Sequence, residues 1–267
     1  MHRFPDGESL VRVDKPPTIA ILYRSLDDPN AKVVELLLAA TALRDNGADK
    51  VLLVVPYLCY MRQDTAFQPG QAVSQRVIGK LLSDHFNGVL TVDAHLHRTY
   101  ALSEVMSGIE AVNIMAAPVV SAAINGDGNV VLVGPDAESR QWVEAIASPL
   151  GSDVLVGEKQ RRGDRDVDIV FDRIDTVAGK RVVLVDDVIS SGATLAVAAK
   201  LVRAAGAESI EAIATHCLAG TRDLAALEAA GIASIHATDS VPGPVANISL
   251  AGLLAREILS LGWVEKR

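Results

Sequence analysis

The stretch RVVLVDDVISSGATL, residues 181–195, constrains the fold of this chain more than any other. It begins with four apolar residues, Val182 to Val185, which predict a short strand buried on both faces of a parallel sheet. Two carboxylates and several small polar residues follow, before an Ala/Leu-rich helical pattern. Small residues let backbone N–H groups approach an anion, and the start of a helix favours negative charge. The stretch therefore predicts a phosphate-binding loop with Asp186 and Asp187 directly before it.

These two acids can reach ribose hydroxyls or a hydrated Mg²⁺, which prefers one or two carboxylates together with substrate oxygens. An ordinary strand–turn–helix with Asp in the turn is the simpler interpretation. The whole pattern, however, resembles the phosphoribosyl-pyrophosphate (PRPP) binding loop of the type I phosphoribosyltransferase fold. The resemblance assigns the loop residues to a sugar phosphate. They are Ser190, Ser191, Gly192, Ala193 and Thr194.

The composition excludes several classes of protein. A chain of 267 residues is long enough for one large domain or two moderate ones. Its formal net charge of -8 argues against a nucleic-acid binder. No apolar run is long enough to span a bilayer, and no signal peptide opens the chain. Cys59 and Cys217 fit no metal spacing, so we expect buried thiols in a reducing cytoplasm. From the charge and the lack of a long apolar run we expect no nucleic-acid or membrane partner.

The order of elements predicts an α/β fold with two similar domains. In the first half, apolar strands at 18–23, 51–55 and 89–92 alternate with helical patterns at 31–46 and 74–86, which predicts a parallel sheet. The sequence RDNGAD at 44–49, between a helical pattern and a strand, resembles RAAGAE at 203–208 in the same setting, which suggests two copies of one unit. We place the domains at 1–117 and 118–248, with a terminal helix in 249–267 that could join the first.

Polar residues follow several of these strands at positions suited to a site. Arg62 and Gln63 come after the strand at 51–55, and His95 follows the strand at 89–92. Asp136 follows the apolar run 130–133. Ligands of open α/β sheets gather at the carboxyl ends of strands, although solvated loops and turns would also account for each residue alone.

A basic segment in this acidic chain is also informative. Residues 158–164, EKQRRGD, lie between strands expected at 153–156 and 167–171, and we interpret them as the tip of a hairpin. A solubilising loop is the alternative. Near the start of the chain, Asp6 is the central residue of a Pro-Asp-Gly turn signal, and Phe4 and Glu8 flank that signal.

Taken in order, these motifs resemble those of the ribose-phosphate pyrophosphokinases, or PRPP synthetases, over nearly the whole length. The resemblance implies two tandem phosphoribosyltransferase-like (type I) domains, each a mainly parallel sheet flanked by helices. It implies that six residues bind ATP: Phe4, Asp6, Glu8, Arg62, Gln63 and His95. It also implies that His95 helps to hold Mg²⁺ together with Asp136. It further implies that Lys159 and Arg161 stabilise the transferring pyrophosphoryl group, while Asp186 and Asp187 orient the ribose.

The implied reaction transfers the pyrophosphoryl group of ATP to ribose 5-phosphate, giving PRPP and AMP, with Mg²⁺ as cofactor. The resemblance also implies a homo-oligomer, a dimer or a hexamer, because the loop at Phe4 completes a neighbour's adenine site. Two alternatives stay open at this point. One is a non-catalytic, synthetase-like nucleotide-binding subunit, and the other is a base phosphoribosyltransferase that consumes PRPP.

Overall fold

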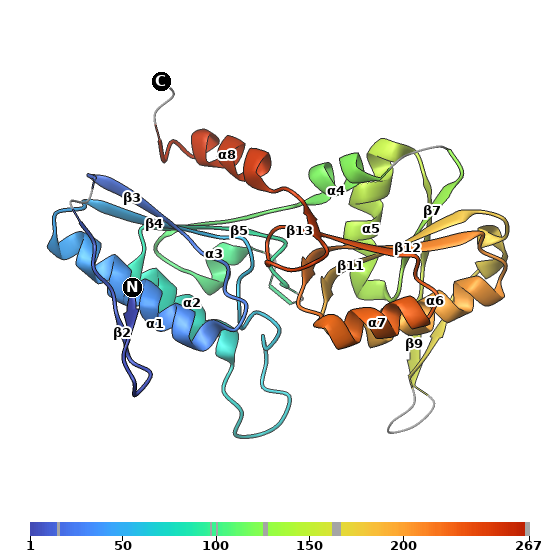
Figure 1. Cartoon of the computed structure of the whole chain (residues 1–267), viewed down its shortest axis with the longest axis horizontal. Coiled ribbons are helices and arrows are strands. Elements are labelled where there is room, and N and C mark those ends of the chain that lie inside the picture. Colours follow the sequence, from blue (N-terminus) through green and yellow to red (C-terminus); the bar gives the residue numbers. More distant parts are fainter. Residues whose placement is uncertain (15–16, 97, 100, 125–127, 162–166, 265–267) are drawn as a thin grey trace. The chain divides into compact units, whose positions relative to one another are not determined.

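The computed structural model describes residues 1–14, 17–96, 98–99, 101–124, 128–161 and 167–264, and Figure 1 shows the course of the chain. The chain forms two compact units. One comprises Met1–Met115 together with Ile258–Arg267, and the other comprises Ala116–Glu257. None of the helices in the described ranges is long and apolar enough to cross a membrane.

The first unit is built on a four-stranded parallel sheet in the order β3-β4-β5-β6. Its strands are β3 (Ile19–Tyr23), β4 (Lys50–Val55), β5 (Gly88–Val92) and β6 (Glu110–Ile114), and its helices before the crossing are α1 (Pro29–Asp45), α2 (Ser74–His85) and α3 (Leu102–Val105). Strand β5 is buried at every residue, and β4 at every residue but its first, as expected from their largely apolar sequences. The parallel arrangement predicted from the alternation of strands and helices is confirmed.

The carboxyl-terminal segment lies with the first unit. After helix α8 (Ala251–Ser260), Trp263 is buried, and its indole Nε1–H donates to Glu110 Oε2 at 2.6 Å in β6. A Cβ placed on Gly88, the first residue of β5, would come within 2.8 Å of the Trp263 ring. Trp263 therefore packs directly over the ends of two strands of the sheet.

We expect Trp263→Ala to loosen the first unit selectively. Removing a buried indole leaves a cavity and typically destabilises by about 3–5 kcal/mol. Trp263→Phe is the matched control, because it keeps an aromatic ring and loses the bond to Glu110, at about 1 kcal/mol. Hydrogen exchange measured by mass spectrometry should show faster exchange in β4, β5 and β6 than in the sheet of the second unit. Equal acceleration in both units would contradict this account.

The second unit carries a six-stranded parallel sheet in the order β14-β13-β12-β11-β7-β8. Its strands are β7 (Val130–Gly134), β8 (Asp153–Val156), β11 (Arg181–Ile189), β12 (Ser209–Cys217), β13 (Ser234–Thr238) and β14 (Ala246–Ile248), and its α-helices that lie wholly in this unit are α4 (Ala117–Ala123), α5 (Arg140–Ala147), α6 (Ala193–Ala204) and α7 (Thr221–Ala229).

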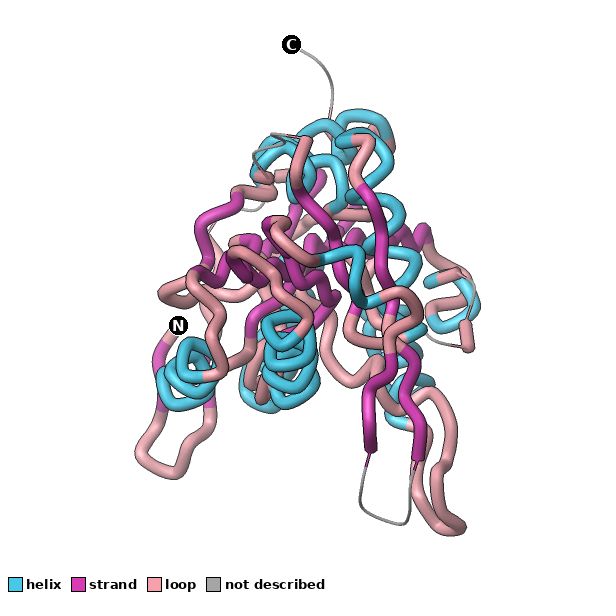
Figure 2. Tube along the Cα trace, turned by 90° about the vertical axis from the view of Figure 1, so that its right-hand side faces the viewer, coloured by secondary structure: helices cyan, strands magenta, loops and turns pink. Residues whose placement is uncertain are grey.

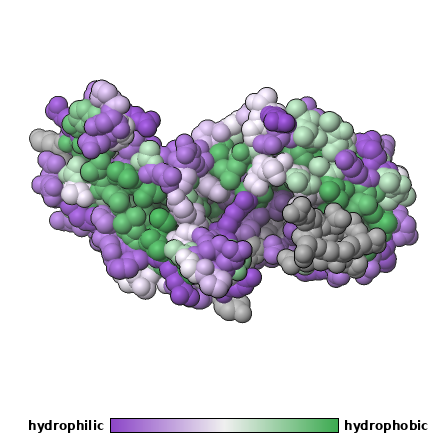
Figure 3. All heavy atoms as spheres, turned by 90° about the horizontal axis from the view of Figure 1, so that it is seen from below, coloured by the Kyte–Doolittle hydropathy of each residue, from purple (hydrophilic) through white to green (hydrophobic). Residues whose placement is uncertain are grey.

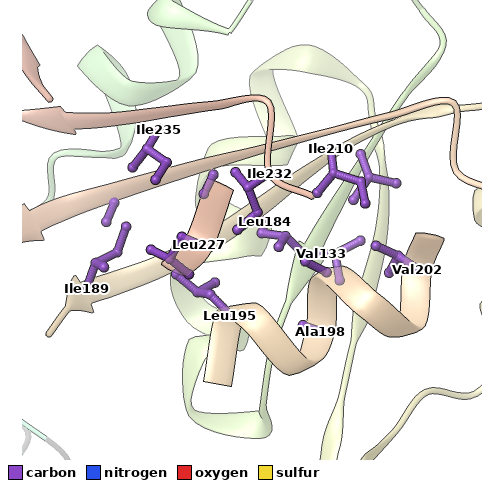
Figure 4. Close-up of a cluster of buried hydrophobic side chains, with 14 of the residues drawn as sticks. Val133, Leu184, Ile189, Leu195, Ala198, Val202, Ile210, Leu227, Ile232 and Ile235 are labelled. Atoms are coloured by element: carbon purple, nitrogen blue, oxygen red, sulfur yellow. The ribbon is translucent and has the colours of Figure 1, made fainter. Parts of the chain in front are cut away.

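The core of this unit lies between the sheet and helices α6 and α7. Leu195, Ala198 and Val202 of α6 point toward Leu184 of β11 and Val133 of β7 in Figure 4. All five side chains are buried. This packing holds the amino terminus of α6 against the carboxyl end of β11, where the sequence predicts the phosphate loop.

Two sequence-based expectations need correction. The hairpin does not use the strand at 153–156, because β8 pairs in parallel with β7 at the edge of the main sheet. Instead, β9 (Glu158–Arg161) pairs antiparallel with β10 (Val167–Val170), and Figure 2 shows these strands side by side. Lys159 and Arg161 therefore belong to a strand and not to the tip, which falls in 162–166, outside the described residues. In addition, the strand predicted at 182–185 is longer than its apolar run. It continues to Ile189, and Val188 and Ile189 are buried and pair with β12.

Candidate functional site

The two acids of the central stretch lie near the carboxyl end of β11. Asp187 is buried, and its Oδ1 accepts from the Val188 amide at 2.8 Å. Asp186 is partly buried, and its Oδ1 accepts from the Asp187 amide at 3.0 Å. Burial, followed by the charges of Asp187 and Asp136, raises the pKa of the Asp186 carboxyl well above its usual value. A hydroxyl donor or a cation brought to this pair would relieve the repulsion.

The loop after β11 has the geometry expected of an anion site. Helix α6 begins at Ala193. Its N-cap residue is Gly192, which has no side chain that could accept a hydrogen bond from the first turn. Gly192 has a left-handed φ of 71°, and a Cβ there would come within 2.7 Å of Leu227 in α7. Glycine is therefore favoured by the backbone conformation, and a larger residue would also have to displace the Leu227 side chain. The uncapped N–H groups of a 12-residue helix make this end suitable for a phosphate.

Asp136 and Lys159 form an ion pair beside these acids. Asp136 follows β7, and its Oδ1 caps the 3₁₀ turn η1 (Ala137–Ser139) by accepting from the amides of Glu138 and Ser139 at 3.1 and 3.2 Å. Its other oxygen, Oδ2, lies 2.5 Å from Lys159 Nζ. The cap orients the Asp136 carboxylate, so that one oxygen faces the hairpin.

The acids around Lys159 also stabilise the charged form of its ammonium group. Burial alone would lower the pKa of its ammonium group. The hydrogen bond and charge of Asp136 outweigh burial, with smaller contributions from Glu138 and Asp186, and the pKa of Lys159 is raised. The second unit therefore brings the predicted cation of the hairpin together with Asp136 and the acids of β11. Arg161 is the last residue of β9 and pairs with Val167 through its backbone, while its side chain lies outside the described part.

The predicted ATP residues Arg62, Gln63 and His95 lie in the first unit, after the carboxyl ends of β4 and β5. Arg62 is exposed, while Gln63 Oε1 accepts from Ser74 Oγ at 2.5 Å at the start of α2. His95 is partly buried. In the loops that carry them, Tyr60 and Asp93 have left-handed φ values of 62° and 40°. Such values in residues other than glycine are held only where the surrounding structure enforces them.

Phe4, Asp6 and Glu8 lie in an exposed hairpin of the first unit, between β1 (His2–Arg3) and β2 (Ser9–Leu10). The Glu8 amide donates to Asp6 Oδ1 at 3.1 Å, which shapes the turn. The hairpin is attached to α1, because Ser9 Oγ donates to Glu35 Oε1 at 3.1 Å. The loop is thus open to solvent, and even the apolar Phe4 is exposed.

No group of three or more His, Cys, Asp or Glu residues in the described part of the chain is arranged to hold a metal ion. Asp136 nevertheless suits Mg²⁺, because this cation commonly takes one or two protein carboxylates and completes its shell with water and substrate phosphate. The oxygen available for it is Oδ2, which Lys159 now contacts.

Sequence analysis missed several residues at these sites. Glu138 contributes to the charge around Lys159, and nothing in the sequence distinguishes it from a surface acid. Asp64 and Arg98 pair across two loops of the first unit, with Arg98 Nη1 at 2.8 Å from Asp64 Oδ1. The proximity of Asp64 to Arg62 was a usable signal, but the pairing with Arg98 is a tertiary contact.

In the second unit, a loop suited to phosphate follows a buried strand of a parallel sheet that carries two acids near its carboxyl end. This arrangement is typical of the phosphoribosyltransferase fold, the class to which this protein belongs. The family model described as phosphoribosyl transferase domain matches residues 103–229, and the model described as N-terminal domain of ribose phosphate pyrophosphokinase matches residues 1–85. The predicted fold class, α/β with two phosphoribosyltransferase-like domains, is therefore confirmed.

The relatives make the assignment more specific. The chain is 34% identical to a ribose-phosphate pyrophosphokinase of Methanopyrus kandleri, and the match covers 97% of this chain and 89% of that protein. It is 35% identical to ribose-phosphate pyrophosphokinase 2 of Archaeoglobus fulgidus, with 96% of this chain and 89% of that protein covered. The crystal structure of phosphoribosylpyrophosphate synthetase from Mycobacterium smegmatis matches with a TM-score of 0.83 and 25% identity, over 97% of this chain and 88% of that one. This chain belongs to the ribose-phosphate pyrophosphokinase family and is an enzyme of the transferase class.

Proposed function

We propose that the protein transfers the pyrophosphoryl group of ATP to ribose 5-phosphate, with PRPP and AMP as products. The observation that carries this proposal is the position of Lys159, which lies beside Asp136 and within electrostatic range of Asp186, in the unit that also contains the uncapped start of α6. A cation beside an anion site and two sugar-binding acids suits transfer of a charged group to a phosphorylated sugar.

In this proposal each part of the second unit has a role. The amides at the start of α6, with Ser191 and Thr194, hold the 5-phosphate, while Asp186 and Asp187 accept hydrogen bonds from the ribose. The anomeric oxygen attacks the β-phosphorus of ATP and loses its proton to solvent, and the bond from that phosphorus to the oxygen it shares with the α-phosphorus breaks, so that AMP leaves with that oxygen. Lys159 and Arg161 stabilise the negative charge on the transferring group. Catalysis of this kind depends on positioning and on cations more than on covalent chemistry.

The first unit supplies the nucleotide site in this proposal. Arg62 is exposed, always charged and able to form two parallel bonds with phosphate oxygens. Gln63 and His95 lie in the loops that follow the carboxyl ends of β4 and β5. The hairpin of Phe4, Asp6 and Glu8 would contact the adenine of a neighbouring copy, which accords with its exposure.

Mg²⁺ is the proposed cofactor, and the family resemblance suggests Asp136 and His95 as the residues that would hold it. When bound, it neutralises charge on the triphosphate. Asp136 would offer Oδ2, the oxygen that contacts Lys159 Nζ in this structure.

A homo-oligomer is also part of the proposal. Ile19 and Tyr23 of β3, the strand at one end of the four-stranded sheet, are exposed, as are Val34 and Leu38 of α1. Green areas in Figure 3 mark apolar residues that reach the surface on the face shown. Exposed apolar side chains beside an edge strand are features of surfaces where subunits associate.

The direct test incubates the protein with ATP, Mg²⁺ and ribose 5-phosphate and follows the products by ³¹P NMR. We expect AMP and PRPP in equal amounts. ADP in place of AMP would indicate an ordinary kinase. ATP binding without turnover would support a non-catalytic subunit, and consumption of PRPP with a nucleobase would support a base phosphoribosyltransferase.

A further inference from the structure

Two loops of the first unit are joined by a set of side-chain contacts that no proposed role yet uses. One loop follows β4 and carries Arg62 and Gln63, and the other follows β5 and carries His95. One contact between them is the ion pair of Asp64 and Arg98, whose Oδ1 and Nη1 atoms are 2.8 Å apart.

The ion pair is asymmetric. The Asp64 side chain is 2% exposed, whereas that of Arg98 is 64% exposed. Among the described residues, Asp64 Oδ2 has no hydrogen-bond partner. A buried acceptor without a donor is destabilising by about 1–3 kcal/mol, and an ion pair with an exposed partner typically contributes only about 0–1 kcal/mol. Fold stability alone is therefore a poor explanation for this pair.

A second connection runs through Gln75 in the first turn of α2. Its side chain is buried, and its Oε1 accepts from Thr99 Oγ1 at 3.3 Å, in the loop of His95. Its backbone amide donates to the Gln63 carbonyl at 3.2 Å, in the loop of Arg62. Within the described parts of these loops, one link is thus by charge and another runs through Gln75.

We propose that Asp64 and Arg98 are positioning residues that set the separation of Arg62 and His95 for ATP. This inference rests on the proposed function. Asp64 lies two residues after Arg62, and Arg98 lies three residues after His95, so a bond between them fixes both loops close to the residues that would contact the nucleotide. A displacement of about 1 Å in such residues can reduce catalysis by about 10²-fold.

The experiment uses the full chain and compares Asp64→Leu/Arg98→Met with wild type. The double variant removes both charges together and keeps similar side-chain volumes, so no uncompensated charge is left buried. We expect the KM for ATP to rise about tenfold or more, with the KM for ribose 5-phosphate within about twofold and the melting temperature close to that of wild type.

Two further variants keep the test decisive. Arg98→Lys retains a donor for Asp64 on an exposed side chain and should fold, with a KM for ATP between those of wild type and the double variant. Lys80→Ala/Asp84→Ala removes an exposed pair on α2, with Nζ 2.8 Å from Oδ2, and should leave both KM values unchanged.

The outcomes separate this inference from the proposed function. If wild type releases no AMP and calorimetry detects no ATP binding, the proposed function fails. If wild type is active and the double variant keeps a wild-type KM for ATP, or both substrates are affected equally, the positioning role is overturned. A fall in melting temperature without a change in KM would likewise assign the pair to fold stability alone.

Discussion

Lys159→Ala is expected to reduce turnover by about 10³-fold while the protein stays folded. The expectation follows from the position of Nζ, 2.5 Å from Asp136 Oδ2 and close enough to Asp186 for their charges to interact. A cation aimed at a transferring phosphoryl group typically contributes factors of this size, because negative charge develops there in the transition state. Since Lys159 lies on the two-stranded hairpin and is partly exposed, its loss should have little effect on folding.

The measurement is the rate of AMP release at saturating ATP and ribose 5-phosphate, with circular dichroism to verify the fold. Lys180→Ala is the matched control, because Lys180 Nζ also contacts a carboxylate, Asp153 Oδ2, at 2.9 Å in the same unit. The control should retain wild-type turnover. Turnover within threefold of wild type in Lys159→Ala would remove the hairpin from the mechanism.

Asp186→Asn is expected to lower activity by about 10²-fold and, at neutral pH, to stabilise the ligand-free protein. Activity falls because an amide replaces a carboxylate that would accept ribose hydrogen bonds. Stability rises because the substitution removes a charge that burial and the charges of Asp187 and Asp136 make unfavourable. A gain of 1 kcal/mol would raise the melting temperature by about 2–4 °C in a chain of this size.

The pH dependence of this gain has a definite sign. The folded protein holds the Asp186 proton more tightly than the unfolded chain, whose Asp pKa is about 3.9. Below that pH both states are protonated and the variant gains nothing. As pH rises, wild type loses stability relative to the variant, until Asp186 is ionised in the folded state as well.

Melting temperatures of wild type and Asp186→Asn measured from pH 4 to pH 8 would test this expectation. Asp153→Asn is the control, because Asp153 is exposed and should show no gain. A variant that is less stable than wild type at pH 7 would contradict the account of the acid pair.

Several features of the fold follow from local patterns. The four apolar residues at 182–185 identified a buried strand, and alternating strands and helices identified parallel sheets. Both hold because burial on two faces requires continuous apolar sequence. The hairpin was predicted only in part. Nothing local indicated that 153–156 would pair with β7, because the choice of strand partner depends on which edge the rest of the sheet leaves available.

The sequence by itself determined the fold class, the family, and the residues to examine at the phosphate loop, since each depends on residue types at short spacings along the chain. Tertiary structure alone decided which charges meet. It placed Lys159 on Asp136, joined Asp64 to Arg98 and packed Trp263 over Gly88, contacts that span 23, 34 and 175 residues along the chain. Such contacts leave no periodic trace in the sequence, because they depend on how strands are ordered in a sheet and on where loops end.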